Sequence, residues 1–297
     1  MSFQVDTALV QAYRANIEIK FQQMGSRFRQ AVRVESQKAE FEFYDRIGPV
    51  DAIEVTNRHS DTPLVSTPHD RRRVGLRDFD WADLIDNKDK LRMLADPTSS
   101  YVTNAVMAMG RAMDDVIVQA AFGTAYAGKT GGTSVTLPAA SEIAVNYVEA
   151  GTAANSNLTI GKLRRARYLL DKAEATTEGQ YDLYIACDPS QIQSLLRTTE
   201  VTNSDYNTVK ALVAGEIDTF MGFKFIKSNR LTVASSIREA IAWERQGLLL
   251  AVGEEIKVDV GPRRDKRNSV QVYVCGSYNS TRMWEEKVMR VKCDETV

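Results

Sequence analysis

The feature that most constrains this fold is one long amphipathic helix predicted in the first half of the chain. Asp96-Pro97 supplies an N-cap residue followed by proline at the first helical position, and Gly123 stands where a C-terminal stop belongs. A helix of about 26 residues would be about 39 Å long, over twice the ordinary mean, so it indicates a structural strut. Its apolar face comprises Val102, Val106, Met109, Met113, Val116, Ile117 and Ala120.

The N-terminal segment predicts a second amphipathic helix. Asp6 and Thr7 are suitable caps, and Gly25-Ser26 is a point where the helix could break or bend. Such a helix needs a surface to lie against, either its own core or a neighbouring subunit. Its apolar stripe is Leu9, Tyr13, Ile17, Phe21, Met24 and Phe28.

Residues 35–80 predict an extended hairpin. Glu40 to Phe43 and part of Val50 to Val55 alternate with a period of two, and Pro63 and Pro68 mark a polar tip. Because isolated two-stranded hairpins are marginal in water, a long one suggests packing onto another chain.

The rest of the chain mixes helices and strands, which places it in the α+β class. Residues 123–157 are predicted as loop with one or two weak elements. Thr159 and Asp188-Pro189 each begin a helix, and Tyr181 to Ala186 is a buried strand between them. No alternating βαβ units of the doubly wound kind and no internal repeat are visible. Further strands are expected at 223–226, 240–243, 248–252, 256–260, 270–274 and 288–291.

Composition excludes several classes. Lysine and arginine number 38 against 39 acidic residues, and this near-neutral balance argues against a dedicated nucleic-acid binder. No run of eighteen apolar residues exists, and the first residues lack a signal peptide's basic and apolar regions, so no membrane partner is expected. Cys187, Cys275 and Cys293 are interpreted as buried free thiols in a reducing cytoplasm.

One stretch has the spacing of a phosphate-binding loop. Residues 123–130 fit G-x-x-x-x-G-K-[ST], with Gly128, Lys129 and Thr130 as the residues that would hold a nucleotide. That loop requires a buried strand before it and a helix after it. Here a helix precedes it and Gly131-Gly132 follows, so a nucleotide hydrolase remains only a remote alternative.

No catalytic, cofactor-binding or metal-binding residue is predicted. His59 and His69 lie among polar residues of the hairpin and are expected to be solvated. Asp114-Asp115 is interpreted as part of a polar helix face, because adjacent helical residues point apart. The run Arg71 to Arg73 could touch nucleic acid, but pairing with Asp78, Asp80 and Asp83, on its own or a neighbouring chain, is favoured.

The order of these elements resembles the major capsid protein family of tailed, double-stranded DNA bacteriophages, in its podovirus-like branch. The likeness covers nearly the whole chain. Asn279 departs from it, since many relatives have glycine there. The segments that carry it are 22–32, 85–89, 96–101, 112–115, 184–191, 215–231, 251–253, 278–282 and 288–291.

The resemblance implies five parts: an N-terminal arm (1–35), an extended E-loop (36–80), a P-domain (81–150) with a spine helix at about 97–122, an A-domain (151–265) that includes part of the P-domain sheet, and a return to the P-domain (266–297). It implies an icosahedral virion capsid of hexamers and pentamers enclosing DNA, assembled in the host cytoplasm, without a cofactor or enzymatic activity.

The expected partners are the chain itself, a portal protein, a decoration protein and packaged DNA through non-specific contact. No long charged coiled-coil segment precedes the arm, so a separate scaffolding protein is expected as well. A nanocompartment shell protein of related fold is the nearer alternative.

Overall fold

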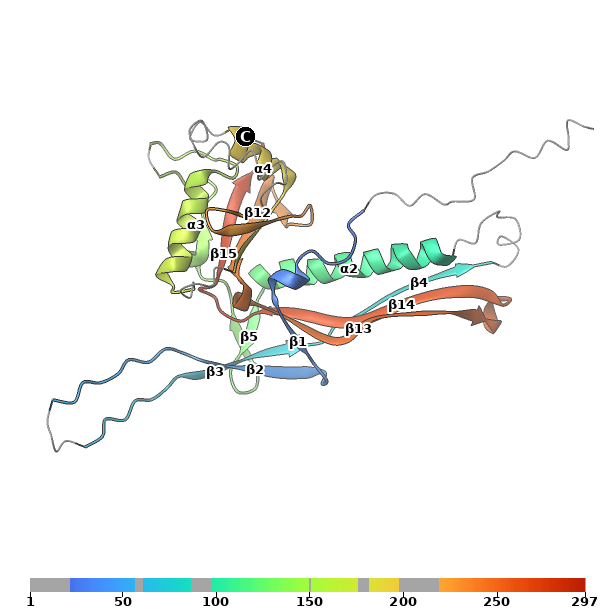
Figure 1. Cartoon of the computed structure of the whole chain (residues 1–297), viewed down its shortest axis with the longest axis horizontal. Helices are drawn as coiled ribbons and strands as arrows, with labels where there is room; N and C mark the ends of the chain where they lie inside the picture. The colour runs from blue at the N-terminus through green and yellow to red at the C-terminus, as the bar shows by residue number, and fades with distance from the viewer. Residues whose placement is uncertain are drawn as a thin grey trace, which may run out of the picture. The chain divides into compact units, whose positions relative to one another are not determined.

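The computed structural model describes residues 22–56, 61–86, 98–149, 151–175, 182–197 and 219–296 (Figure 1). These ranges combine helices and strands, and the fold is α+β as predicted. The helices are α2 (Thr98–Phe122), α3 (Ile160–Lys172) and α4 (Pro189–Arg197). The strands are β1 (Arg33–Ser36), β2 (Phe41–Ile47), β3 (His69–Gly75), β4 (Asp78–Ile85), β5 (Ala125–Ala127), β6 (Thr133–Val135), β7 (Glu142–Ile143), β8 (Leu183–Cys187), β9 (Thr219–Phe220), β10 (Phe223–Lys227), β11 (Val233–Ala234), β12 (Ile237–Glu244), β13 (Leu248–Arg263), β14 (Ser269–Arg282) and β15 (Val288–Asp294).

The described residues form two compact units, each assembled from segments that are distant in the sequence. Unit 1 takes its residues from 1–25, 78–112 and 254–277, and unit 2 takes the remainder. The long helix α2 and the strands β13 and β14 contribute residues to both units. No helix within the described ranges is long and apolar enough to cross a membrane.

Unit 1 contains a β-hairpin and an edge strand. Strand β4 pairs antiparallel with β14, from Asp78 opposite Ser277 to Ile85 opposite Val270. Arg267 and Asn268 adopt left-handed backbone angles, with φ of 54° and 59°, in the turn between β13 and β14. The two short strands expected at 248–252 and 256–260 are a single strand, β13. The prediction of a break was wrong because Gly253 and two glutamates continue the extended backbone.

The larger sheet of unit 2 has the order β7-β15-β12-β8-β10-β9, with β11 beside β12. Its core is apolar, with Leu163 and Leu170 of α3 packed among the buried residues of β8 and β12. The predicted caps are confirmed: Thr159 accepts a hydrogen bond from the Lys162 amide, and Pro189 opens α4. One feature was not foreseen, since β8 and β10 are parallel strands with α4 between them, which makes a single βαβ crossover.

The long helix is confirmed. Its end at Phe122 agrees with the predicted stop, while the Asp96-Pro97 cap lies outside the described residues. In its second half Met113, Val116 and Ile117 are buried, because they recur at three- and four-residue spacing on one face.

The N-terminal helix is wrong where it can be compared. Residues 22–28 are not helical, Gly25 has a φ of 70°, and Met24 is 78% exposed. Phe28 is buried as expected, but it is held by the short turn Arg29–Ala31 and not by a helical stripe. Residues 1–21 of this prediction lie outside the described ranges.

Candidate assembly surface

Strands β2 and β3 form an extended antiparallel ribbon, named here the arm (residues 41–75). The pairing runs from Phe41 opposite Gly75 to Ile47 opposite His69, and the Gly48 amide continues it by donating to the Pro68 carbonyl (3.0 Å). The expected hairpin is therefore confirmed at its base. The strand expected at 50–55 was wrong, because residues 48–56 have no regular structure and no paired neighbour.

The arm exposes apolar side chains where an ordinary surface strand would expose polar ones. Along β2 the exposed face carries Phe41, Phe43 and Ile47, while Tyr44 and Arg46 lie on the more buried face. Of the seventeen large apolar side chains exposed in the described residues, eight lie between residues 41 and 65, with exposed fractions from 36% at Phe43 to 94% at Leu64. A concentration of this kind marks a surface that another molecule covers.

A buried charge network fixes the base of the arm. The Arg72 guanidinium is fully buried and is paired with Glu285, which also accepts a hydrogen bond from Arg46 (Nη1 to Oε2, 3.1 Å). Arg46 forms a second ion pair with Asp70 on the neighbouring strand (2.7 Å). The Arg282 Nε lies 3.8 Å from Glu285. One carboxylate thus holds three guanidinium groups together.

Burial and pairing shift the pKa values of these groups in opposite directions. Desolvation lowers the pKa of Arg72, and it lowers the pKa of Arg282 as well. For Arg46 burial also opposes the charged form, but hydrogen bonds with Asp70 and Glu285 outweigh it and raise the pKa. Burial acts against the ionised Asp70, yet the hydrogen bonds from Arg46 and from the Arg71 and Gly128 amides hold its pKa below the ordinary value.

Arg282 also joins this network to the end of α2. Its Nη1 donates to the carbonyls of Ala121 (2.9 Å) and Gly123 (3.0 Å), and its Nη2 donates to Val135 (3.1 Å). Unpaired carbonyls end every helix, and a cation is favourable there. The side chain therefore caps α2 and ties it to the β5–β6 hairpin.

The interpretation of Arg71 to Arg73 was wrong. None of the three pairs with Asp78, Asp80 or Asp83 within the described residues. Arg71 pairs with Asp45 across the arm (3.1 Å), and Arg72 is buried against Glu285. These partners were missed because alternation along β3 sends consecutive side chains to opposite faces. The acidic residues of β4 have other donors, since Tyr273 donates to Asp80 and Ser277 donates to Asp78.

The Asp114-Asp115 pair also departs from the expected polar face. Asp114 is fully buried and accepts hydrogen bonds from the Ser26 hydroxyl (2.5 Å) and the Arg27 amide (3.1 Å). Asp115 pairs with Arg230 at a partly exposed site. Asp114 therefore anchors the start of the segment that leads to β1, and the Trp243 indole donates to Ala31 of the same segment (2.9 Å).

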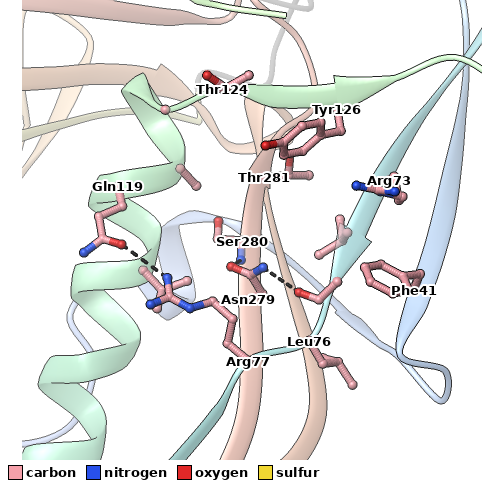
Figure 2. A pocket seen from close by; sticks show the side chains of 15 residues that line it. Phe41, Arg73, Leu76, Arg77, Gln119, Thr124, Tyr126, Asn279, Ser280 and Thr281 are labelled. Atoms are coloured by element: carbon pink, nitrogen blue, oxygen red, sulfur yellow. Dashed lines mark hydrogen bonds between the residues drawn. The ribbon is translucent and has the colours of Figure 1, made fainter. Parts of the chain in front are cut away.

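A cavity of about 360 Å³ lies at the base of the arm (Figure 2). Figure 2 shows Arg73 and Phe41 on one side, Gln119 of α2 on the other, and Asn279 between them. The Asn279 amide donates to the Gly75 carbonyl (2.5 Å), so this departure from the family pattern braces the cavity wall. The lining residues are Phe41, Arg73, Val74, Gly75, Leu76, Arg77, Val116, Gln119, Ala120, Gly123, Thr124, Tyr126, Asn279, Ser280 and Thr281.

The phosphate-loop spacing belongs to a β-hairpin. Strands β5 and β6 pair antiparallel on either side of residues 128–132, and no helix follows Thr130. The Gly128 amide points at the Asp70 carboxylate (3.4 Å), which would repel a phosphate. The geometry contradicts a nucleotide site at this position.

The remaining predicted residues are solvated or buried without a shared site. His69 is exposed on β3, and His59 lies outside the described residues. Cys187 and Cys293 are buried, and burial raises the pKa of Cys293 to about 12. Cys275 is only half-buried, so the prediction that all three are buried was wrong for it. Within the described residues no three histidine, cysteine or acidic side chains gather as metal ligands.

Sequence reasoning missed the residues that organise this surface. Glu285, Arg282 and Asp70 gave no signal, because their partners lie far away in the sequence. The one available hint was the polarity of β2, where the apolar residues 41, 43 and 47 alternate with a tyrosine and an arginine.

Comparisons with known proteins agree on one family. The family model described as phage capsid protein matches residues 5–295. The capsid of Ralstonia phage GP4 has a TM-score of 0.77 at 10% identity, covering 96% of this chain and 95% of that chain. The capsid of cyanophage Pam1 scores 0.72 at 12% identity, and a Mycobacterium phage Che8 structure scores 0.65 at 14%, each covering 97% of both chains. At these identities the structural likeness shows the fold alone. None of the curated proteins searched matches significantly.

Proposed function

Because this chain belongs to the phage capsid protein family and is a major capsid protein, the structural subunit of an icosahedral phage head, we propose that its arm is the element by which each copy holds its neighbour. The observation that supports this is the inverted face of β2, where Phe41, Phe43 and Ile47 face solvent. A subunit alone leaves that face uncovered, and a second copy is the partner that a shell supplies at every position.

The energetics favour such a contact. Each half-exposed isoleucine or valine on the arm would contribute about 1 kcal/mol when a partner buries the rest of its surface. Several such side chains, repeated around a hexamer or pentamer, stabilise an interface of the permanent kind, which commonly buries more than about 2,000 Å². The rigid base is needed as well, because a loosely held arm would lose ordering entropy on docking.

In the terms of the family, we propose residues 1–35 as the N-terminal arm and 36–80 as the E-loop. The P-domain would comprise 81–150 with α2 as its spine, 151–265 the A-domain, and 266–297 the return to the P-domain. Further proposed partners are a separate scaffolding protein, a portal protein, a decoration protein and, through non-specific contact, the packaged DNA. The proposal assigns the chain no catalytic activity.

The test is shell assembly by a variant that lacks residues 51–65. This deletion leaves the Gly48–Pro68 hydrogen bond and the Arg46–Asp70 ion pair in the chain, so the base of the arm is retained. Wild type and variant would be expressed alone and with a candidate scaffolding protein, and then compared by negative-stain electron microscopy and sedimentation.

The expected result is closed shells from the wild type and soluble capsomers or monomers, with unchanged circular dichroism, from the deletion. Lys129→Ala is the control, since this exposed side chain lies on the β5–β6 turn outside the arm. Normal shells from the deletion variant would refute the proposal.

A further inference from the structure

The cavity at the base of the arm has an unbalanced charge. Its fifteen lining residues include two arginines, Arg73 and Arg77, and no carboxylate. The Arg73 guanidinium lies 5.1 Å from the Phe41 ring centroid and 5.2 Å from that of Tyr126, so aromatic rings hold it in place. Within the described residues it has no carboxylate partner.

Nearby negative partial charge does not cancel this excess. The end of α2 contributes Gln119, Ala120 and Gly123 to the wall, and helix carbonyls would ordinarily make that end negative. Arg282 already donates to the Ala121 and Gly123 carbonyls, so a third cation offsets them. The cavity therefore suits an occupant that has both a carboxylate and apolar side chains.

The arm itself contains such a segment. Residues 50–55 are Val-Asp-Ala-Ile-Glu-Val, with two carboxylates and no basic residue, and all six side chains are exposed. In an extended chain Asp51, Ile53 and Val55 share one face, because successive side chains alternate. That face presents one acid beside two apolar groups, which matches the arginines and aromatic rings of the cavity.

A subunit's own segment cannot fill its own cavity. Phe41 lines the cavity, and pairing of β2 with β3 carries Ile47 about 20 Å away from it at about 3.3 Å per residue. Residues 48–56 then contain no turn or bend that would reverse the chain. The segment must therefore come from another molecule.

We propose that the cavity at the base of the arm is the receptor for residues 50–55 of a second copy of this chain, with Arg73 and Arg77 facing Asp51 and Glu54. This inference rests on the proposed docking of the arm and names the site at which it docks. It makes the contact directional, since the far part of one arm enters the base of the next, and such a head-to-tail contact can close into rings.

Engineered cysteines test the contact directly. In a Cys275→Ser background, the pair Ile53→Cys and Thr124→Cys would place one thiol on the segment and one on the cavity rim. The matched control is Ile53→Cys with Thr232→Cys, because Thr232 is equally exposed in the chain but does not line the cavity. Shells assembled from each variant would be oxidised and analysed on denaturing gels without reductant.

A ladder of covalent oligomers from the Thr124 pair, absent from the Thr232 pair, is the expected result. Shells that form but give no ladder would overturn this inference while leaving the docking of the arm intact. Loss of the docking itself would be seen separately, as normal shells from the 51–65 deletion.

Charge reversal provides a second test that does not depend on thiol geometry. Arg73→Glu should raise the subunit concentration needed for shells by at least about tenfold, as expected for loss of a single interfacial charge pair. Adding Asp51→Lys and Glu54→Lys to the same chain should reverse most of that increase. No rescue, together with less DNA retained by filled heads, would mean that the cavity takes phosphate, and the inference would be wrong.

Discussion

Replacing Glu285 with glutamine should destabilise the subunit more than any other single conservative change at the base of the arm. Glu285 is buried and holds Arg72, Arg46 and Arg282. An amide has nearly the same shape as the carboxylate, but it has no charge and directs N–H donors at guanidinium donors. The variant therefore leaves buried cations uncompensated without opening a cavity.

The magnitude follows from the geometry. A pair of unit charges about 4 Å apart interacts by about 4 kcal/mol at an effective dielectric constant of about 20. Desolvation offsets much of that, and removal of one partner from a buried pair typically costs about 3–5 kcal/mol. Since whole proteins are stable by only about 5–15 kcal/mol, the loss should be large enough to measure easily.

Equilibrium urea unfolding of unassembled subunits, followed by tryptophan fluorescence, is the assay. The Arg46 guanidinium lies 5.0 Å from the Trp284 ring centroid, so one fluorophore reports on the base of the arm. Glu286→Gln is the control, because this neighbouring carboxylate is exposed and its loss should change stability by less than about 0.5 kcal/mol. If the two variants unfold at the same urea concentration, the charge network does not hold the base of the arm.

Three further outcomes are expected. Asp114→Ala should cost about 2–3 kcal/mol in urea unfolding because buried donors of residues 26–28 lose their acceptor, whereas Asp115→Ala should cost less than about 1 kcal/mol at its partly exposed ion pair; equal losses would contradict the anchoring role. The lowered pKa of Asp70 means that its contribution is present above the ordinary value near 3.8 and is lost as pH falls through the folded value, so stability measured from pH 5 to pH 2 should fall less steeply in Asp70→Asn; identical slopes would argue against the ion pair with Arg46. Thr159→Ala should lower the unfolding free energy by about 1 kcal/mol through loss of the α3 cap, and no change would show that the cap is dispensable.

Local signals in the sequence determined the regular elements. The spacing of Met109, Met113 and Val116 predicted α2, and Thr159 predicted the start of α3, because both depend on residues within a few positions of each other. The period-two pattern at 40–43 likewise predicted the base of the arm. It failed at 50–55, since a strand needs a paired neighbour and none is present in the chain.

The charged residues of the surface were decided only by tertiary structure. Arg72, Asp114 and Lys162 are fully buried, although nothing in their sequence neighbourhoods distinguishes them from solvated charges. The Lys162 ammonium, for example, donates to four backbone carbonyls, including Lys292 of β15 (2.9 Å).

The physical reason is the difference between local and long-range interactions. A cap or an apolar stripe is fixed by residues a few positions apart, so the sequence alone determines it. The Glu285 network joins residues 46, 70, 72, 282 and 285, and the cavity gathers segments 41, 73–77, 116–126 and 279–281. Such a site exists only after the strands have paired, because burial is what turns these charges from solvated groups into partners.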